Sequence, residues 1–294
     1  MIYDIKLQIG HEFSHAAFGA RQMACVMPLQ IAGRQRLIAG LLTLDPHPEE
    51  RVDRVDFFGN FITEFACFAS HDTMTLTLQA RVELTAAAAP PPTCDLTLAD
   101  LDQVLNDSRD MTGQSPLHFV TDSVRVATNP TMTAFAQAAI APGMTLRDCV
   151  LAVGQAIYHH MEFDAEATTV DTTPAEAFET AHGVCQDFSH IMIACLRGLG
   201  IPSGYVSGYL RTLPPPGKPR LEGADAMHAW VRAWCGPALG WIEFDPTNNV
   251  MPGTDHIVVA YGRDYSDVSP LVGVLRSSGH QTSQQAVDVI PVAD

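Results

Sequence analysis

The stretch GVCQDF, residues 183–188, puts a cysteine at the point where a helix is expected to begin. Hydrophobic residues then recur at spacings of three and four, which predicts a helix with one buried stripe. The stripe consists of Val184, Phe188, Ile191, Met192, Cys195 and Leu199. Arg197 in the last turn, Gly200 after it and Pro202 beyond are typical of a helix end. Cys185 is therefore expected in the first turn, where unpaired backbone N–H groups and the helix dipole favour a thiolate.

A shorter helix is expected just before this one. Residues 173–176 read TPAE, which offers an N-cap, a proline at the first helical position and an acid at the third. This helix is expected to end near Gly183. Asp187 also falls in the first turn of the cysteine-bearing helix, where it suits the dipole. As an anion it would oppose a thiolate, so we assign it a structural role.

A histidine and an aspartate farther along the chain are expected to meet on adjacent strands. Residues 226–234 alternate in polarity, with His228 on the same face as two tryptophans, and residues 241–245 form a second strand-like run. A hairpin centred between Gly236 and Pro237 pairs His228 with Asp245, at a Cβ separation of about 4.5–5.5 Å. That distance allows the carboxylate to fix the imidazole tautomer so that its other nitrogen faces a thiol. Alternatively, Asp245 is only a turn residue, and a bulge would shift the register.

These stretches together resemble a known family. They are GVCQDF (183–188), LGIP (199–202), YVSGY (205–209), HAWV (228–231) and FDPTN (244–248). Over roughly residues 145 to 265 the chain resembles the transglutaminase-like superfamily, in particular its bacterial cysteine peptidase branch. DFFGN (56–60) is similar to the β-domain that precedes the core in that branch.

The resemblance implies a papain-like, transglutaminase-like α+β fold in which a helix-borne cysteine packs on an antiparallel sheet. It also implies Cys185 as nucleophile, His228 as base and Asp245 as orienting acid. Ser203 departs from the family pattern, in which many relatives carry a small residue followed by arginine after the Ile-Pro pair. This difference bears on the cleft and not on the three catalytic positions.

A second motif near the N-terminus favours a different chemistry. HEFSH, residues 11–15, matches the H-E-x-x-H pattern of zinc metalloproteases, which requires a helix. The preceding Ile5, Leu7 and Ile9 alternate, so the segment is expected to be a strand. On a strand the two histidines share a face but lie about 13 Å apart, too far to bind one zinc ion. We therefore predict no metal and no cofactor.

Composition limits the class of partner. The 294 residues carry 17 basic and 33 acidic side chains, a net charge of 17 − 33 = −16, which argues against nucleic acid and anionic membranes. The seven cysteines show no metal-ligand spacing, and the first residues lack the basic and apolar regions of a signal peptide. We expect reduced thiols, a cytoplasmic location, and a peptide or protein substrate; the oligomeric state is left open.

Four segments are expected. Residues 1–89 should form a β-sandwich-like domain ending in an Ala-Pro linker at 86–92, and residues 90–144 a helical connection. Residues 145–275 should form the catalytic core and residues 276–294 a peripheral tail. Short strands are expected at 5–9, 37–44, 61–69 and 73–84, a capped helix at 145–161, and core strands at 203–211, 226–234, 241–245, 256–262 and 268–275. A Pro-rich insertion at 214–219 joins two core strands.

The sequence thus predicts a thiol enzyme that transfers an acyl group from an amide to water, a cysteine peptidase or amidase. Two alternatives stay open. If an amine resolves the acyl-enzyme, the protein is a transglutaminase. If the three residues are misaligned, it is a non-catalytic peptide-binding protein with this fold.

Overall fold

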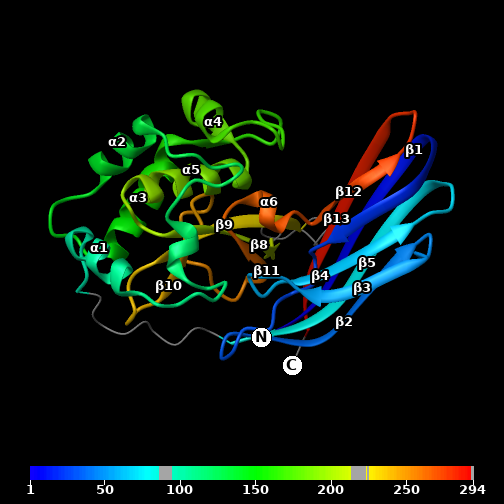
Figure 1. Ribbon diagram of the computed structural model, residues 1–294, viewed down its shortest axis with the longest axis horizontal. Helices are drawn as coiled ribbons and strands as arrows, with labels where there is room; N and C mark the ends of the chain where they lie inside the picture. The colour runs from blue at the N-terminus through cyan, green and yellow to red at the C-terminus, as the bar shows by residue number, and fades with distance from the viewer. Residues whose placement is uncertain (86–94, 213–222, 224, 293–294) are drawn as a thin grey trace, which may run out of the picture.

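The computed structural model describes residues 1–85, 95–212, 223 and 225–292. A mixed helical and sheet core lies beside a long, curled antiparallel sheet, so the predicted α+β fold class is confirmed (Figure 1). The expected linker at 86–92 and the insertion at 214–219 fall outside the described residues. Among the described helices none is long and apolar enough to cross a membrane.

The N-terminal sheet is built around one long strand. Its members are β1 (Ile2–Ala24), β2 (Gln35–Asp45), β3 (Glu50–Val55), β4 (Phe61–Cys67), β5 (His71–Leu84), β12 (Leu271–Arg276) and β13 (Gln281–Pro291). The order is β2-β5-β1-β4-β3, with β12 and β13 also paired to β1. The first half of β1 pairs with β5 and β13, and its second half with β4 and β12. The register of the β1–β5 pairing shifts between Glu12 and Ala17 of β1, as expected where a strand bends to take part in two halves of a sheet.

The end of the chain differs from the prediction. Residues 276–294 were expected to be a peripheral tail, but β13 pairs with β1 from Phe13 to Tyr3, and its Val287 and Val289 are fully buried. Residues 268–275 were expected to form a strand of the core. Instead, Val268 is the last residue of the short helix α6 (Tyr265–Val268), and most of the remaining residues belong to β12, which pairs with β1 of the N-terminal sheet. Both predictions were wrong, because strand periodicity does not reveal which sheet a strand joins.

The longer helices of the core precede its main sheet in the chain. The helices before that sheet are α1 (Leu98–Asp107), the 3-10 helix η1 (Pro116–Phe119), α2 (Pro130–Ala139), α3 (Leu146–His160), α4 (Pro174–Thr180) and α5 (Cys185–Gly198). The two N-caps expected from the sequence are present. The Thr145 side chain accepts a hydrogen bond from the Asp148 amide, and Thr173 with Glu176 forms a capping box before α4. These caps fix where α3 and α4 begin.

The core sheet has four antiparallel strands in the order β10-β9-β8-β11. They are β8 (Ser203–Leu210), β9 (Ala226–Trp234), β10 (Trp241–Phe244) and β11 (His256–Gly262). A short parallel pair, β6 (Glu162–Phe163) with β7 (His182–Gly183), sits just before α5. Helix α5 packs on β8 and β9 and is covered by α2, α3 and α4 (Figure 1). It is consequently buried all round from Gln186 to Arg197, not along a single stripe as predicted.

Side chains join the two parts of the molecule. Arg34 of the N-terminal domain forms a bidentate pair with Glu243 of β10, with Nη2 2.7 Å from Oε2. Asn60 Nδ2 donates to the Tyr261 carbonyl, and Asn60 Oδ1 accepts from the Tyr261 amide. Gln35 bonds both backbone groups of Val258 in the same way. These buried contacts join the N-terminal domain to β11 at one edge of the core sheet and, through Glu243, to β10 at the other.

Candidate active site

Cys185 is the first residue of α5, as the sequence predicted. At this position its backbone N–H has no acceptor within the helix, and the positive end of the helix dipole points toward the side chain. The side chain is half-buried, whereas Cys25, Cys67, Cys149, Cys195 and Cys235 are buried. Among the described cysteines, Cys185 is therefore the one that solvent and reagents reach.

Close packing explains why residue 183, two positions before this cysteine, is a glycine. A Cβ added at Gly183 would lie 2.6 Å from Asp187 Oδ2 and 2.8 Å from Asp187 Cβ. That carboxylate is occupied, because Asp187 Oδ2 accepts the Val184 amide at 2.8 Å and the Thr168 hydroxyl at 2.7 Å. Burial raises the pKa of Asp187, while these two hydrogen bonds lower it. Asp187 thus has the structural role expected for it: it caps α5 and ties the loop after β6 to the first turn.

His228 and Asp245 meet as predicted, but through a different register. The observed pairing sets Phe244 opposite Val231 and Trp241 opposite Trp234, so the chain continues with Asp245 beside Trp230. The predicted pairing of Asp245 with His228 was wrong by two residues. Because side chains repeat every two residues along a strand, an even shift keeps His228 on the same face. Its Nε2 lies 2.7 Å from Asp245 Oδ2, with both side chains buried.

Asp245 accepts five hydrogen bonds and is fully buried. Oδ2 accepts from His228 Nε2 at 2.7 Å, His256 Nε2 at 3.0 Å and Asn248 Nδ2 at 2.8 Å. Oδ1 accepts from the backbone amides of Thr247 and Asn248. Burial alone would raise the pKa of Asp245, but the hydrogen bonds from His228 and His256 hold it far below its usual range. The residue therefore binds the backbone of the turn and the ring of His228 at the same time.

His228 links this carboxylate to the thiol. Burial alone would lower its pKa, but hydrogen bonds with Asp245 and with Cys185 raise the pKa of His228 to about 10. Since Nε2 is directed at Asp245, Nδ1 is the nitrogen left to face the Cys185 sulfur. The ring is therefore held as an imidazolium by Asp245 Oδ2, with the Cys185 side chain as its other partner.

Sequence reasoning missed His256 and Asn248. His256 opens a strand that was predicted, and Asn248 belongs to the FDPTN stretch, yet neither was assigned a role. Alternation along one strand does not reveal that the starts of β9 and β11 converge on the turn after β10. The convergence is tertiary: β8 lies between β9 and β11 in the sheet.

The three residues His228, Asp245 and His256 have the composition of a metal site. Their ligand atoms all lie within 4.8 Å of one another. Zinc bonds of about 2.0–2.1 Å in a tetrahedral site would separate two ligand atoms by roughly 3.3 Å. The contacts on Asp245 Oδ2, at 2.7 and 3.0 Å, are hydrogen-bond distances instead. The residues thus fit each other better than they fit an ion between them.

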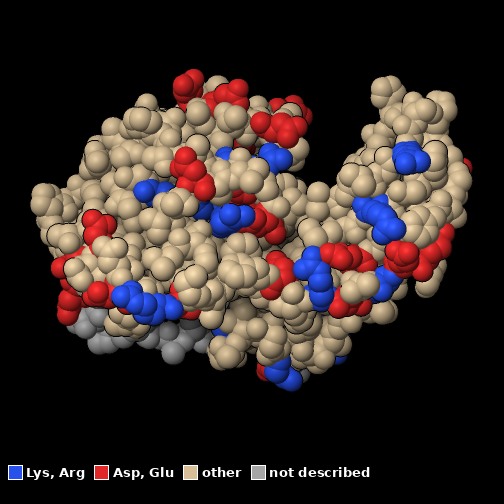
Figure 2. All heavy atoms as spheres, in the orientation of Figure 1, with Lys and Arg blue, Asp and Glu red and all other residues tan. Residues whose placement is uncertain are grey.

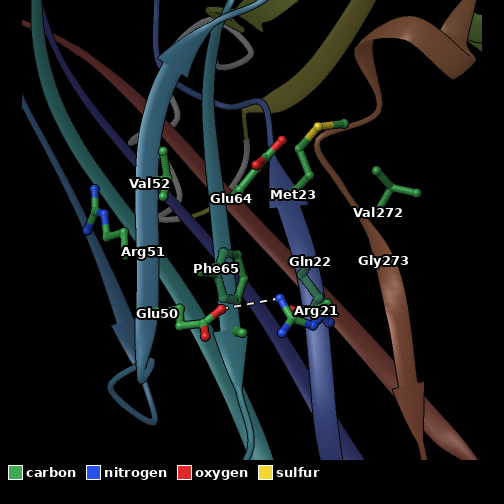
Figure 3. Close-up of a pocket in the computed structure, with 11 residues that line it drawn as sticks. Arg21, Gln22, Met23, Glu50, Arg51, Val52, Glu64, Phe65, Val272 and Gly273 are labelled. Carbon is green, nitrogen blue, oxygen red and sulfur yellow. Dashed lines mark hydrogen bonds and ion pairs between the residues drawn. The ribbon is translucent and has the colours of Figure 1, made fainter.

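The HEFSH segment lies within strand β1, as expected, and not on a helix. His11 Nδ1 is 2.8 Å from Ser283 Oγ of β13, and His15 is exposed. A shallow groove of about 410 Å³ lies elsewhere on this sheet, across β3, β4, β1 and β12 (Figure 3). Its Arg21 and Glu50 pair with each other at 3.2 Å, and it holds neither a cysteine nor a histidine. Neither feature supplies a nucleophile.

A wide hollow separates the core from the outer end of the N-terminal sheet (Figure 2). The loop between β6 and α4 stands at its rim on the core side (Figure 1). This loop contacts the cysteine-bearing turn, because Thr168 bonds Asp187 and Gln186 Nε2 lies 3.5 Å from the Val170 carbonyl. The hollow therefore borders the segment that supports Cys185.

Comparison with known proteins identifies the same two regions. A family model described as the transglutaminase-like superfamily matches residues 133–246, and one described as the bacterial transglutaminase-like N-terminal region matches residues 3–83. An uncharacterized protein of Mycobacterium tuberculosis is 35% identical over 264 residues, covering 88% of this chain and 83% of that protein. An uncharacterized protein of Mycobacterium leprae is 30% identical over 242 residues, covering 81% of each.

Two further comparisons come from named proteins. The protein-glutamine gamma-glutamyltransferase of Pseudomonas aeruginosa is 38% identical over 87 residues, which is 29% of this chain and 13% of that protein. A crystal structure of a candidate cysteine protease from Cytophaga hutchinsonii superposes with a TM-score of 0.71 at 21% identity, covering 100% of this chain and 91% of that one. At that identity the superposition establishes a shared fold.

Proposed function

Because the chain belongs to the transglutaminase-like superfamily, with its bacterial N-terminal region, we propose that it is a thiol acyltransferase acting on peptides or proteins. Cys185 is the nucleophile, His228 the proton carrier and Asp245 the orienting acid. The observation that carries the proposal is the buried hydrogen bond of His228 Nε2 to Asp245 Oδ2, at 2.7 Å, on a histidine whose pKa is also raised by Cys185 at the start of α5. A non-catalytic peptide-binding protein would not need this arrangement.

The chemistry follows from these contacts. The Cys185 thiolate attacks an amide carbonyl, and the Cys185 backbone N–H, free at the helix start, donates to the developing oxyanion. The carbon–nitrogen bond breaks as the imidazolium of His228 gives its proton to the leaving amine. Neutral His228 then takes a proton from water, whose oxygen attacks the thioester; the carbon–sulfur bond breaks, releasing a carboxylic acid and restoring the Cys185 thiolate beside the His228 imidazolium. Asp245 stays ionised throughout and stabilises the imidazolium when it forms.

Hydrolysis is the reaction we favour, since nothing in the mechanism excludes water from the thioester. The local similarity to the Pseudomonas gamma-glutamyltransferase favours a second candidate, in which an amine attacks the same thioester. Both reactions share the first half and the same three residues. They differ only in which nucleophile resolves the acyl-enzyme.

The first test is alkylation with iodoacetamide at pH 6, followed by peptide mapping. Cys185 should react fastest of the seven cysteines, because it is half-buried beside an imidazolium while burial raises the pKa of Cys25 and Cys195 to about 12. Equal labelling of Cys185 and a cysteine such as Cys67 would contradict the proposal.

A second test separates the two reactions. Casein is incubated with the protein in ¹⁸O-water, with and without methylamine, and the products are read by mass spectrometry. Hydrolysis incorporates ¹⁸O into a new carboxylate; transfer adds methylamine to glutamine. Cys185→Ala should abolish either product, and Cys67→Ala, in the N-terminal sheet, should leave it unchanged.

A further inference from the structure

Two histidines donate to one oxygen of the orienting acid. His228 Nε2 and His256 Nε2 lie 2.7 and 3.0 Å from Asp245 Oδ2. They come from different strands, β9 and β11, and both are buried. No role in the proposed chemistry is yet assigned to the second histidine.

A glycine and a tryptophan bring His256 to this point. Strand β8 lies between the two histidines, and its Gly208 pairs with His228 on one side and with Val258 on the other. A Cβ at Gly208 would lie 2.3 Å from the Trp230 ring. The missing side chain admits the Trp230 ring over β8, and His256 packs edge-on against that ring with centroids 5.2 Å apart. The position of His256 is therefore determined by packing on three strands.

Hydrogen bonding determines its tautomer. Asp245 is ionised, so its oxygen only accepts, and His256 Nε2 must carry a proton. His256 Nδ1 is buried and has no hydrogen-bond partner among the described residues. A proton there would leave a buried donor of a charged ring unsatisfied, which costs more than an unsatisfied lone pair. The hydrogen bonds therefore place the ring proton of His256 on Nε2 and leave Nδ1 as the bare nitrogen.

We propose that His256 is a positioning residue that acts on catalysis through Asp245, by fixing the carboxylate oxygen that orients His228. This inference rests on the proposed function of the Cys185 site. With His256 in place, Oδ2 is held from both sides while Oδ1 is held by two backbone amides, so the carboxylate cannot rotate away from His228. Without that donor, Oδ2 keeps only His228 Nε2 and Asn248 Nδ2 as partners and is no longer held from the β11 side.

Matched substitutions test the inference. His256→Gln keeps an N–H donor near the position of Nε2, and His256→Met has nearly the same length without a donor. The rate of Cys185 alkylation at pH 7 and the kcat for casein cleavage should fall about 10–100-fold in His256→Met, by analogy with residues that orient metal ligands, whose loss costs that much activity. His256→Gln should stay within about threefold of wild type, a difference below 1 kcal/mol, and KM should be unchanged in both.

The outcomes separate the inference from the function it rests on. A wild-type protein without selective Cys185 alkylation would overturn both. Selective alkylation in the wild type with an unaltered, folded His256→Met variant would overturn only the role of His256. Equal losses in His256→Gln and His256→Met would also overturn it, because a merely structural role would not be rescued by the donor.

A spectroscopic measurement covers the case in which His256→Met does not fold. In ¹⁵N-histidine-labelled wild-type protein at pH 7, the signals absent from His256→Gln identify His256. They should show a protonated Nε2 and an unprotonated Nδ1. A doubly protonated His256 ring would overturn the proposal.

Discussion

At the scale of single residues, one buried carboxylate organises the site. Asp245 closes the turn through Oδ1 and holds two histidines and Asn248 through Oδ2. The consequence is an imidazolium at His228 whose pKa is raised to about 10, since the hydrogen bonds of Asp245 and Cys185 outweigh the effect of burial. Two predictions belong to this scale.

The first concerns Asp245→Asn and the pH dependence of catalysis. A raised pKa means that the protonated ring persists below about pH 10 and is lost as the pH rises through that value. Removing the Asp245 charge leaves burial to lower the pKa of His228, so the basic limb of the kcat/KM profile should move to lower pH. At pH 8, kcat should fall by about 10²–10⁴.

The profile is measured on casein cleavage between pH 5 and 11. Asp255→Asn is the control, because this neighbouring acid is bound to Arg211 and Tyr3 and does not contact His228. A basic limb at the wild-type position in Asp245→Asn would show that Asp245 does not support the imidazolium.

The second concerns Gly183→Ala. The added methyl group would displace the Asp187 carboxylate, which caps α5 and binds Thr168. Loss of a cap costs about 0.5–2 kcal/mol, and the cysteine-bearing turn would shift with it. We expect a lower free energy of unfolding and slower Cys185 alkylation. Gly10→Ala, where an added Cβ meets nothing within 4 Å, should change neither quantity.

At the scale of elements, whether a sequence motif can form a metal site depends on whether it lies on a helix or on a strand. HEFSH would form a zinc site on a helix, but β1 carries it along a strand of 23 residues. The N-terminal alternation of buried Ile5, Leu7 and Ile9 specifies the strand. The cysteine motif, in contrast, lies at a helix start, where the local backbone supports its chemistry.

The third prediction follows from that contrast. Protein dialysed against zinc and then buffer should not retain stoichiometric zinc through His11 and His15, as measured by elemental analysis. A chelator should leave Cys185 alkylation unchanged, and so should the double substitution His11→Ala/His15→Ala. Stoichiometric zinc that disappears in the double variant would contradict the strand-based argument.

At the scale of the whole molecule, the N-terminal domain and the site are joined by buried polar contacts. Arg34 pairs with Glu243, and Glu243 also accepts the Trp230 indole N–H at 2.7 Å. The Trp230 ring in turn packs against His228 and His256. A chain of direct contacts therefore runs from Arg34 of the N-terminal domain to His228 and His256.

The fourth prediction tests this contact. Arg34→Met removes the cationic partner of the buried Glu243 carboxylate and should lower the free energy of unfolding by on the order of 2–3 kcal/mol. A double-mutant cycle with Glu243→Gln, read by chemical denaturation, should give a coupling free energy of about 1–3 kcal/mol. Strict additivity of the two substitutions would show that the pair contributes nothing.

The fifth prediction concerns the C-terminal strand β13. Val289 is fully buried against the N-terminal sheet, and the adjacent Ile290 is exposed. Val289→Ala should cost about 1.5–3 kcal/mol of unfolding free energy and Ile290→Ala less than about 1. Equal and small effects would restore the view that residues 276–294 form a peripheral tail.

The sequence by itself determined the local structures that carry Cys185 and His228. The caps before α3 and α4, the start of α5 at Cys185 and the strands around His228 all depend on neighbours within a few residues, so local patterns report them. The face of β9 that carries His228 was predictable as well, because it depends only on a two-residue period.

Only the tertiary structure decided how these elements meet. The hairpin register differs by two residues, because turn geometry and packing fix it and alternation does not. Strands β12 and β13 pair with β1, which begins some 270 residues earlier in the chain. Their periodicity does not indicate that β1 is the strand with which they pair. The contact of His256 with Asp245 was not predictable either. Contacts between segments distant in sequence depend on long-range packing, which a local sequence pattern does not report.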